Sequence, residues 1–113
     1  MKLEGEQVLL RMHMSNFVRW HTGPLYEALV GRARREHLAG ATVLSGIYGY
    51  VDRGRVLGEH PNALQVERPV VVEIVDTRER IEAFMPLVDE AIGEGLATLE
   101  PVQIRFYRSG VKP

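Results

Sequence analysis

The sequence GATVLSGIYGYVDRGR, residues 40–55, predicts a β-strand that ends in a polar loop. Its first half is rich in β-branched, aliphatic and aromatic residues, which favour strands. Gly46 and Gly49 interrupt the strand, and the segment then turns cationic at Arg53 and Arg55. Glycines let a backbone approach a ligand closely and arginines pair with anions, so the loop is a candidate anion site. A strand that ends in an ordinary solvated hairpin loop would show the same pattern.

The segments on either side alternate between strand and helix patterns. Apolar residues at every second position predict strands, and apolar residues three or four positions apart predict helices. A long loop, residues 52–68, would join the second and third strands. The predicted strands are Glu6–Met14, Gly40–Val51, Pro69–Val75 and Leu99–Tyr107, and the predicted helices are Pro24–Leu38 and a segment that follows Asp76 and ends near Gly93.

Capping residues predict where these helices begin and end. Gly40 would supply the left-handed residue that ends the first helix. Asp76 would cap the second helix, with Glu79 reaching back to complete a capping box. A catalytic or metal-binding carboxylate is the functional alternative for Asp76. Pro86 lies inside the second helical pattern and would kink or split it.

The element order β-α-β-β-α-β predicts a ferredoxin-like split β-α-β fold in a single domain, residues 1–113. Right-handed crossovers then give a four-stranded antiparallel sheet with both helices on one face. The first and third strands would be neighbours in the centre of the sheet. The residues expected to face the helices are Val8, Leu10, Met12, Val70, Val72, Ile74, Val102, Ile104 and Phe106.

The opposite face of this sheet would be half apolar and half charged. A solvated sheet face is normally more polar, whereas this mixture is typical of a subunit interface. We therefore predict a closed homo-oligomer packed through this face, with Arg11 and Glu73 paired across the central strands. An exposed amphipathic sheet is the alternative. The predicted interface residues are Leu9, Arg11, His13, Glu73 and Tyr107.

Composition argues against several classes of protein. The chain has no cysteine, so it has neither a disulfide framework nor a thiolate site. Its formal charge of −1 provides no general basic field for nucleic acid. No apolar segment approaches the roughly 20 residues that span a bilayer, and the N-terminus lacks the pattern of a signal peptide. These features predict a soluble cytoplasmic protein with no nucleic-acid partner and no membrane insertion.

No motif predicts an enzyme. The sequence lacks a Ser/His/Asp signature, a nucleophile elbow and a phosphate-binding loop. The four histidines, at 13, 21, 37 and 60, lie on different elements without metal-ligand spacing, so no catalytic residue, cofactor or metal is predicted. Anion binding remains, where the loop edge of one subunit faces its neighbour. The predicted ligand-binding residues are Gly46, Tyr48, Gly49, Arg53, Arg55, Gly93, Gly95, Arg105 and Arg108.

Several segments resemble the PII-like proteins of unknown function, relatives of the nitrogen-regulatory PII signal proteins. The resemblance covers residues 5–107 and rests on GEQVLLRM, GPLYEALV, GATVLSGIYGY, PVVVEIVDT and IEAFMPLVDEAI. It implies a ferredoxin-like homotrimer. In PII proteins nucleotide lies between subunits, and a long loop after the second strand contacts a target protein.

By position, residues 46–49 would match the base of that loop and residues 52–68 the loop itself. Gly93 and Gly95 would match a phosphate-contacting glycine pair, and Arg105 and Arg108 the cationic end strand. Leu96 stands where PII proteins have a phosphate-holding lysine, which favours a smaller or different anionic effector.

The hypothesis is a PII-like signalling protein that binds a small anionic or nucleotide effector between subunits and contacts an unknown target protein. The alternatives are a trimeric divalent-metal-binding or metal-tolerance protein of the same fold, or an effector-free adaptor of a membrane transporter.

Overall fold

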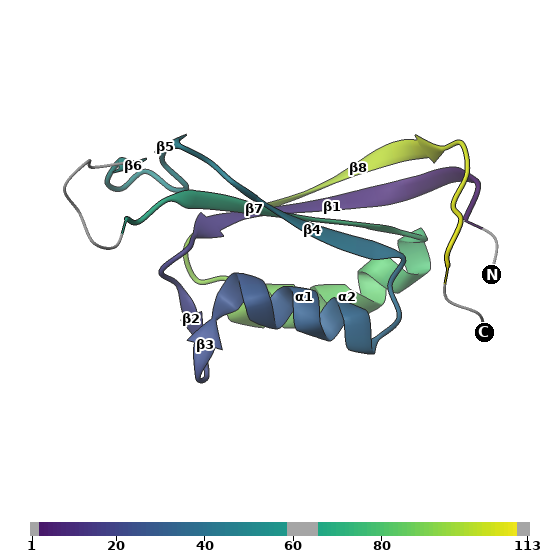
Figure 1. The fold of residues 1–113 in the computed structure, drawn as a ribbon, viewed down its shortest axis with the longest axis horizontal. Helices are drawn as coiled ribbons and strands as arrows, with labels where there is room; N and C mark the ends of the chain where they lie inside the picture. The colour runs from purple at the N-terminus through teal and green to yellow at the C-terminus, as the bar shows by residue number, and fades with distance from the viewer. Residues whose placement is uncertain (1–2, 59–65, 111–113) are drawn as a thin grey trace.

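The computed structural model describes residues 3–58 and 66–110. Its centre is a four-stranded antiparallel sheet in the order β4-β7-β1-β8, with both helices on one face (Figure 1). This arrangement confirms the predicted ferredoxin-like architecture, including the central pairing of the first and third long strands. The main elements are β1 (Gly5–Ser15), α1 (Leu25–Arg35), β4 (Gly40–Ser45), β7 (Pro69–Asp76), α2 (Arg78–Ala91) and β8 (Leu96–Ile104).

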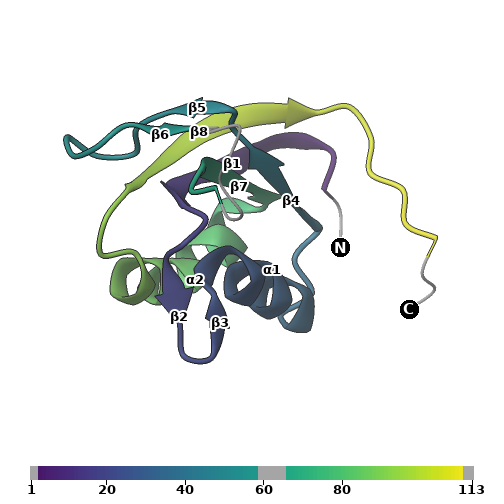
Figure 2. The ribbon, with the colours of Figure 1, turned by 60° about the vertical axis from the view of Figure 1, so that its left-hand side comes forward.

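Four short strands add two hairpins to this plan (Figure 1). The first hairpin precedes α1, and the second follows β4 at the end of the sheet where β1 ends. Figure 2 shows α1 and α2 side by side beneath the sheet, with the first hairpin at their ends. The hairpins are formed by β2 (Arg19–Trp20) with β3 (Gly23–Pro24) and by β5 (Tyr48–Gly49) with β6 (Leu57–Gly58).

The predicted strand from Gly40 to Val51 is wrong in its second half. β4 ends at Ser45, and Gly46 N then donates a hydrogen bond to Pro69 O over 2.7 Å. A Cβ at Gly46 would lie 2.9 Å from Cγ of Pro69, so the close approach requires glycine. The chain leaves the sheet at this point and enters the second hairpin. Part of the predicted 52–68 loop is therefore ordered, whereas residues 59–65, with His60, lie outside the described ranges.

The core lies between the sheet and the helices. Alternate residues of β1 and β7 point toward the helices, as the period-two pattern predicts. Three residues of α1 and four of α2 complete the core at helical spacing. The core cluster is Val8, Leu10, Met12, Met14, Leu25, Leu29, Ala33, Val70, Val72, Ile74, Ile81, Phe84, Val88 and Ala91.

The last strand differs from the prediction in its bounds and in its face. β8 spans Leu96–Ile104, three residues earlier than expected. Val102 pairs with Gln7, which alternates with the buried residues of β1, and directly paired residues share a face. Val102 and Ile104 therefore lie on the helix-free face, and Phe106 lies beyond the strand and is exposed. Their predicted place in the core is wrong.

The helix boundaries also differ. His37, with φ of 59°, is the left-handed residue after α1, whereas Gly40 begins β4. α2 continues through Pro86 and is not split. Within the described parts of the chain, neither helix is long and apolar enough to cross a bilayer.

Asp76 is not the cap of α2. Thr77 is the N-cap, and its Oγ1 accepts a hydrogen bond from Arg80 N over 3.2 Å. The Asp76 side chain is 1% exposed and accepts from Ala39 N over 2.9 Å through Oδ2 and from Thr77 N over 2.7 Å through Oδ1. Asp76 therefore joins the end of β7 to the connection between α1 and β4.

Candidate functional site

The helix-free face carries an ion cluster at its centre. Arg11 donates from Nε to Glu73 Oε2 over 2.8 Å and from Nη1 to Glu100 Oε1 over 3.0 Å. The hydrogen bond to Glu73, supported by the charges of both carboxylates, raises the pKa of Arg11. The predicted contact between Arg11 and Glu73 is confirmed. Glu100 is a second partner that sequence reasoning missed.

Strand register arranges the side chains of this face in rows across the sheet. The row of Arg11 and Glu73 is polar. The next row, which contains His13, is apolar except for that histidine. Leu44 and Leu96, at the two edges of that neighbouring row, are 49% and 52% exposed. Isolated exposed leucines are ordinary, but a continuous row beside a satisfied ion cluster is typical of a protein contact surface. The apolar row consists of Leu44, Val71, His13 and Leu96.

A hollow of about 450 Å³ lies at the end of this face where β8 ends. Leu9 and Ile104 line it, together with Tyr107 from the segment after β8. The Tyr107 hydroxyl donates a hydrogen bond to Ala39 O over 2.8 Å, and this bond holds the segment against the start of β4. The predicted interface residues Leu9 and Tyr107 thus lie at one end of the face, and His13 lies in the apolar row.

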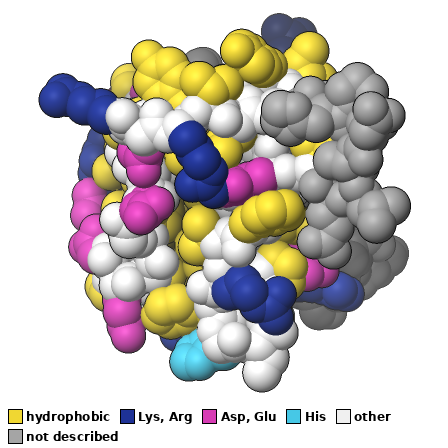
Figure 3. All heavy atoms as spheres, turned by 90° about the vertical axis from the view of Figure 1, so that its left-hand side faces the viewer, with side chains coloured by type: hydrophobic (Ala, Val, Ile, Leu, Met, Phe, Trp, Pro, Cys, Tyr) yellow, Lys and Arg dark blue, Asp and Glu magenta, His cyan; other side chains and the backbone are white. Residues whose placement is uncertain are grey.

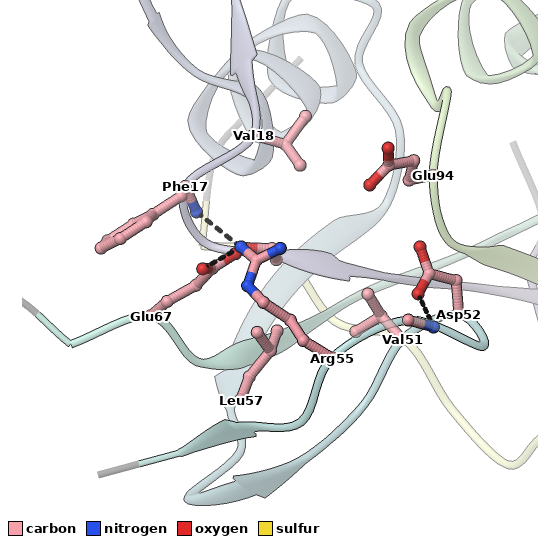
Figure 4. A pocket seen from close by; sticks show the side chains of 10 residues that line it. Phe17, Val18, Val51, Asp52, Arg55, Leu57, Glu67 and Glu94 are labelled. Atoms are coloured by element: carbon pink, nitrogen blue, oxygen red, sulfur yellow. Dashed lines mark hydrogen bonds and ion pairs between the residues drawn. The ribbon is translucent and has the colours of Figure 1, made fainter. Parts of the chain in front are cut away.

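A second hollow, of about 420 Å³, lies at the opposite end of the sheet (Figure 4). Figure 3 views the molecule from this end, where acidic and basic side chains alternate with hydrophobic ones around a recessed surface. We refer to this hollow as the loop-end pocket. It is lined by Ser15, Phe17, Val18, Val51, Asp52, Gly54, Arg55, Leu57, Glu67 and Glu94.

The loop-end pocket is organised by an ion pair between Arg55 and Glu67, whose carboxylate also accepts a hydrogen bond from Ser15 Oγ. Burial alone would raise the pKa of Glu67, but the hydrogen bonds from Arg55 and Ser15 and the Arg55 charge hold that pKa below its usual value. The Glu67 hydrogen bond in turn raises the pKa of Arg55. The pocket therefore contains a charged pair at neutral pH.

The two partners of this ion pair are held to different degrees. Asn16 donates from Nδ2 to Val66 O over 3.1 Å, and its Oδ1 accepts from Arg68 N over 2.8 Å. Asn16 N also donates to Arg68 O over 3.0 Å. The backbone around Glu67 is thus fixed to the end of β1. By contrast, the Arg55 side chain is 70% exposed.

Two further carboxylates face the same pocket. Asp52 Oδ1 accepts from Gly54 N over 2.6 Å, a turn hydrogen bond that uses one of its two oxygens. Glu94 lies between Gly93 and Gly95, and no ion pair to it is found within residues 3–58 and 66–110. Its charge contributes to the raised pKa of Arg55. Among the described residues, the pocket lining thus holds one cation and three carboxylates together with several apolar side chains.

Of the predicted ligand-binding residues, Arg55 is in the lining of the loop-end pocket, and others belong to segments at the same end of the sheet. The hairpin with Gly46, Tyr48 and Gly49, the loop with Arg53 and Arg55, and the turn of Gly93 and Gly95 all lie at the loop end (Figure 1). A Cβ at Gly95, where φ is 146°, would clash with the carbonyl oxygen of His13, so that position requires glycine.

Arg105 and Arg108 lie elsewhere. They follow β8, whose nine residues separate them from the loop end by about 30 Å at the usual strand rise. The Arg108 guanidinium stacks over Phe106, 4.2 Å from the ring centroid. One chain alone cannot bring these arginines to Arg55, so their predicted convergence requires a second subunit.

Sequence reasoning missed Ser15, Glu67 and Glu94 as site residues. Glu94 could have been found, because it lies inside the glycine pair that was identified. Ser15 and Glu67 are 52 positions apart, and nothing local indicates that they meet. For the metal alternative, the part of the chain that the structure describes contains no group of three histidine, aspartate or glutamate side chains able to hold an ion.

These features define a ferredoxin-like α+β protein with one open sheet face and a mixed-charge pocket at its loop end. The family model DUF190, described as "Uncharacterized ACR", matches residues 7–104, and the chain belongs to this family. Over 100 residues it is 37% identical to a UPF0166 protein of Aquifex aeolicus, with 87% of this chain and 92% of the relative covered. It is 32% identical over 84 residues to UPF0166 protein MJ1524 of Methanocaldococcus jannaschii, with 74% and 77% covered.

Proposed function

We propose that this protein is a non-catalytic, PII-like signalling protein of the cytoplasm. It assembles as a homotrimer through the helix-free sheet face and binds a small anionic or nucleotide effector between subunits. The 52–68 segment passes the signal to a target protein. The observation that carries the proposal is the helix-free face, where a satisfied ion cluster lies beside an apolar row.

The ion cluster supports assembly because each of its charges already contacts one of opposite sign, with Arg11 shared between two carboxylates. Burying an unpaired charge is costly, whereas Arg11 has carboxylate partners on both neighbouring strands. The adjacent row offers Leu44 and Leu96 for burial. A second copy of the chain can therefore cover this face without leaving an isolated charge.

The two ends of the sheet support effector binding between subunits. The loop end carries Arg55 and the Gly93–Gly95 turn, and the opposite end carries Arg105 and Arg108. In a closed ring, the loop end of one subunit would meet the arginine end of its neighbour. Cations from two chains would then face one effector, as guanidinium groups do at many anion sites.

Light scattering coupled to size-exclusion chromatography tests the assembly. The wild-type chain is expected to elute as a trimer at micromolar concentration, and Leu44→Lys and Leu96→Lys as smaller species with unchanged circular dichroism. Val56→Lys is the matched control, because Val56 is 53% exposed but belongs to the second hairpin and not to the four-stranded sheet. A wild-type monomer would refute the assembly.

Calorimetry tests the effector. Nucleotides and small phosphate and carboxylate metabolites are titrated into the intact trimer, and saturable heat is expected from at least one of them. An intact trimer with no heat from any of them would refute the sensing role and would favour the effector-free adaptor.

A further inference from the structure

The charges of the loop-end pocket restrict what its effector can be. Among the described residues that line it, Arg55 is the cation, and Asp52, Glu67 and Glu94 are the carboxylates. Figure 4 shows Glu67 on one side of the Arg55 guanidinium, with Asp52 and Glu94 on the other. A polyphosphate or tricarboxylate placed here would gain one arginine and face up to three negative side chains. Like charges in contact are disfavoured, so the pocket of one chain selects against polyanions.

A ligand that carries both signs fits this arrangement. Its anionic group can replace Glu67 on the exposed Arg55 side chain, because Arg55 has no other ion-pair partner within the described ranges. Its cationic group can then pair with the freed Glu67 or with Glu94. Glu67 keeps its hydrogen bond from Ser15, so it stays in place when Arg55 is taken. The ligand therefore breaks the ion pair between Arg55 and Glu67 but supplies each of these two residues with a new partner of opposite charge.

The lining of the pocket sets the rest of the ligand. Val18, Val51 and Leu57 are apolar and lie around the charged groups (Figure 4). The volume, about 420 Å³, suits a small metabolite. A short aliphatic chain between the two charged groups would cover these side chains.

We propose that the loop-end pocket binds a small zwitterion of the amino-acid type, whose carboxylate displaces Glu67 from Arg55 and whose ammonium group faces Glu67 and Glu94. The inference rests on the proposed function, since the pocket is taken as the effector site. Within the pocket of one chain, it adds a cationic group to the anionic group of the proposed effector. Glu67 acts as an internal competitor that occupies Arg55 until the ligand arrives.

The test uses the full chain labelled with ¹⁵N. Each of the twenty common amino acids is titrated separately and followed by NMR of the backbone amides of the loop-end pocket. Inorganic phosphate and ATP serve as probes without an ammonium group. At least one amino acid is expected to shift the amides of residues 52–57 and 94, and the matching deaminated acid is expected to bind several-fold more weakly.

Glu94→Gln gives a result of opposite sign for the two classes of probe. The substitution is expected to weaken binding of the amino acid by about threefold, the scale of one exposed ion pair. It is expected to strengthen binding of phosphate by a similar factor. Arg55→Gln is expected to weaken binding of both the amino acid and phosphate. Glu90→Gln, an exposed change of the same charge on α2, is expected to alter neither. Glu94 is exposed, and no ion pair within the described ranges is lost when it is replaced.

The outcomes separate this inference from the proposed function. If none of the amino acids shifts the amide signals, the zwitterion proposal is overturned, whether or not ATP binds. Weaker binding of phosphate to the Glu94→Gln variant would also overturn the zwitterion proposal, because the Glu94 carboxylate would then support anion binding. ATP bound to an intact trimer, with no amino acid bound, refutes the zwitterion and leaves the anionic sensor standing. An amino acid bound with the expected signs to a monomer supports the pocket and refutes binding between subunits.

Discussion

Replacing Asp76 by asparagine distinguishes the two roles that this residue can have. Asparagine and aspartate are about equally good N-caps, so Asp76→Asn would be almost neutral if Asp76 served only as the cap of α2. The structure instead uses both carboxylate oxygens, one for Ala39 N and one for Thr77 N. An asparagine offers one oxygen, and its amide group would point a donor at the remaining N–H.

The expected cost follows from these contacts. A buried N–H that loses its acceptor costs about 1–3 kcal/mol, and a hydrogen bond to a charged acceptor is stronger than one to a neutral acceptor. The ion pair between Asp76 and Arg80, 3.7 Å apart, is lost as well. We expect Asp76→Asn to lower the free energy of unfolding by about 2–4 kcal/mol. At this chain length, that corresponds to a fall in Tm of roughly 8–16 °C.

Urea unfolding followed by circular dichroism measures the change, at one fixed protein concentration because assembly would contribute to stability. Thr77→Ala is the matched control, since it removes the observed cap and is expected to cost about 1 kcal/mol. The expected order of destabilisation is therefore Asp76→Asn above Thr77→Ala. A nearly neutral Asp76→Asn would restore Asp76 as the cap and refute the reasoning from its two hydrogen bonds.

Two further predictions concern the loop end. Gly95→Ala places a Cβ against the carbonyl oxygen of His13 and forces a left-handed residue, so it should separate the start of β8 from β1. Hydrogen exchange at residues 96–98 should rise while exchange at β7 does not, whereas Gly93→Ala, with open space around its Cβ, should be tolerated. The depressed pKa of Glu67 means that its carboxylate stabilises the fold above its ordinary pKa and that this contribution is lost as pH falls through the folded value. The stability difference between the wild type and Glu67→Gln should therefore be full at pH 7 and shrink below about pH 4.5, and a difference that is constant with pH would contradict it.

The parts of the fold that sequence reasoning predicted are those with a strong local pattern. β1 and β7 alternate cleanly, and their expected pairing in the centre of the sheet was enough to predict the contact between Arg11 and Glu73. The pattern failed for β8, because apolar residues occupy both of its faces and an edge strand buries neither one fully. Only the pairing with β1 decides which set faces the helices.

Other errors came from tertiary contacts that no local signal reports. The strand after Gly40 ends where Gly46 closely approaches Pro69, a residue 23 positions away. Asp76 and Thr77 are both good caps, and the hydrogen bond from Ala39 decides between them. In the loop-end pocket, Arg55 and the glycine turn were predictable from the local sequence, whereas Glu67 was not, because its partner Ser15 lies 52 positions earlier in the chain.

The neck of the long connection between β4 and β7 has a consequence for how the chain can be altered. Gly46 and Pro69 are hydrogen-bonded at its base, and Asn16 independently forms hydrogen bonds with the backbone of Val66 and Arg68. The entropy of closing a loop rises only with the logarithm of its length. Foreign peptides or whole domains spliced between residues 58 and 66 should therefore leave the sheet intact, which makes this neck a natural point for building fusion reporters.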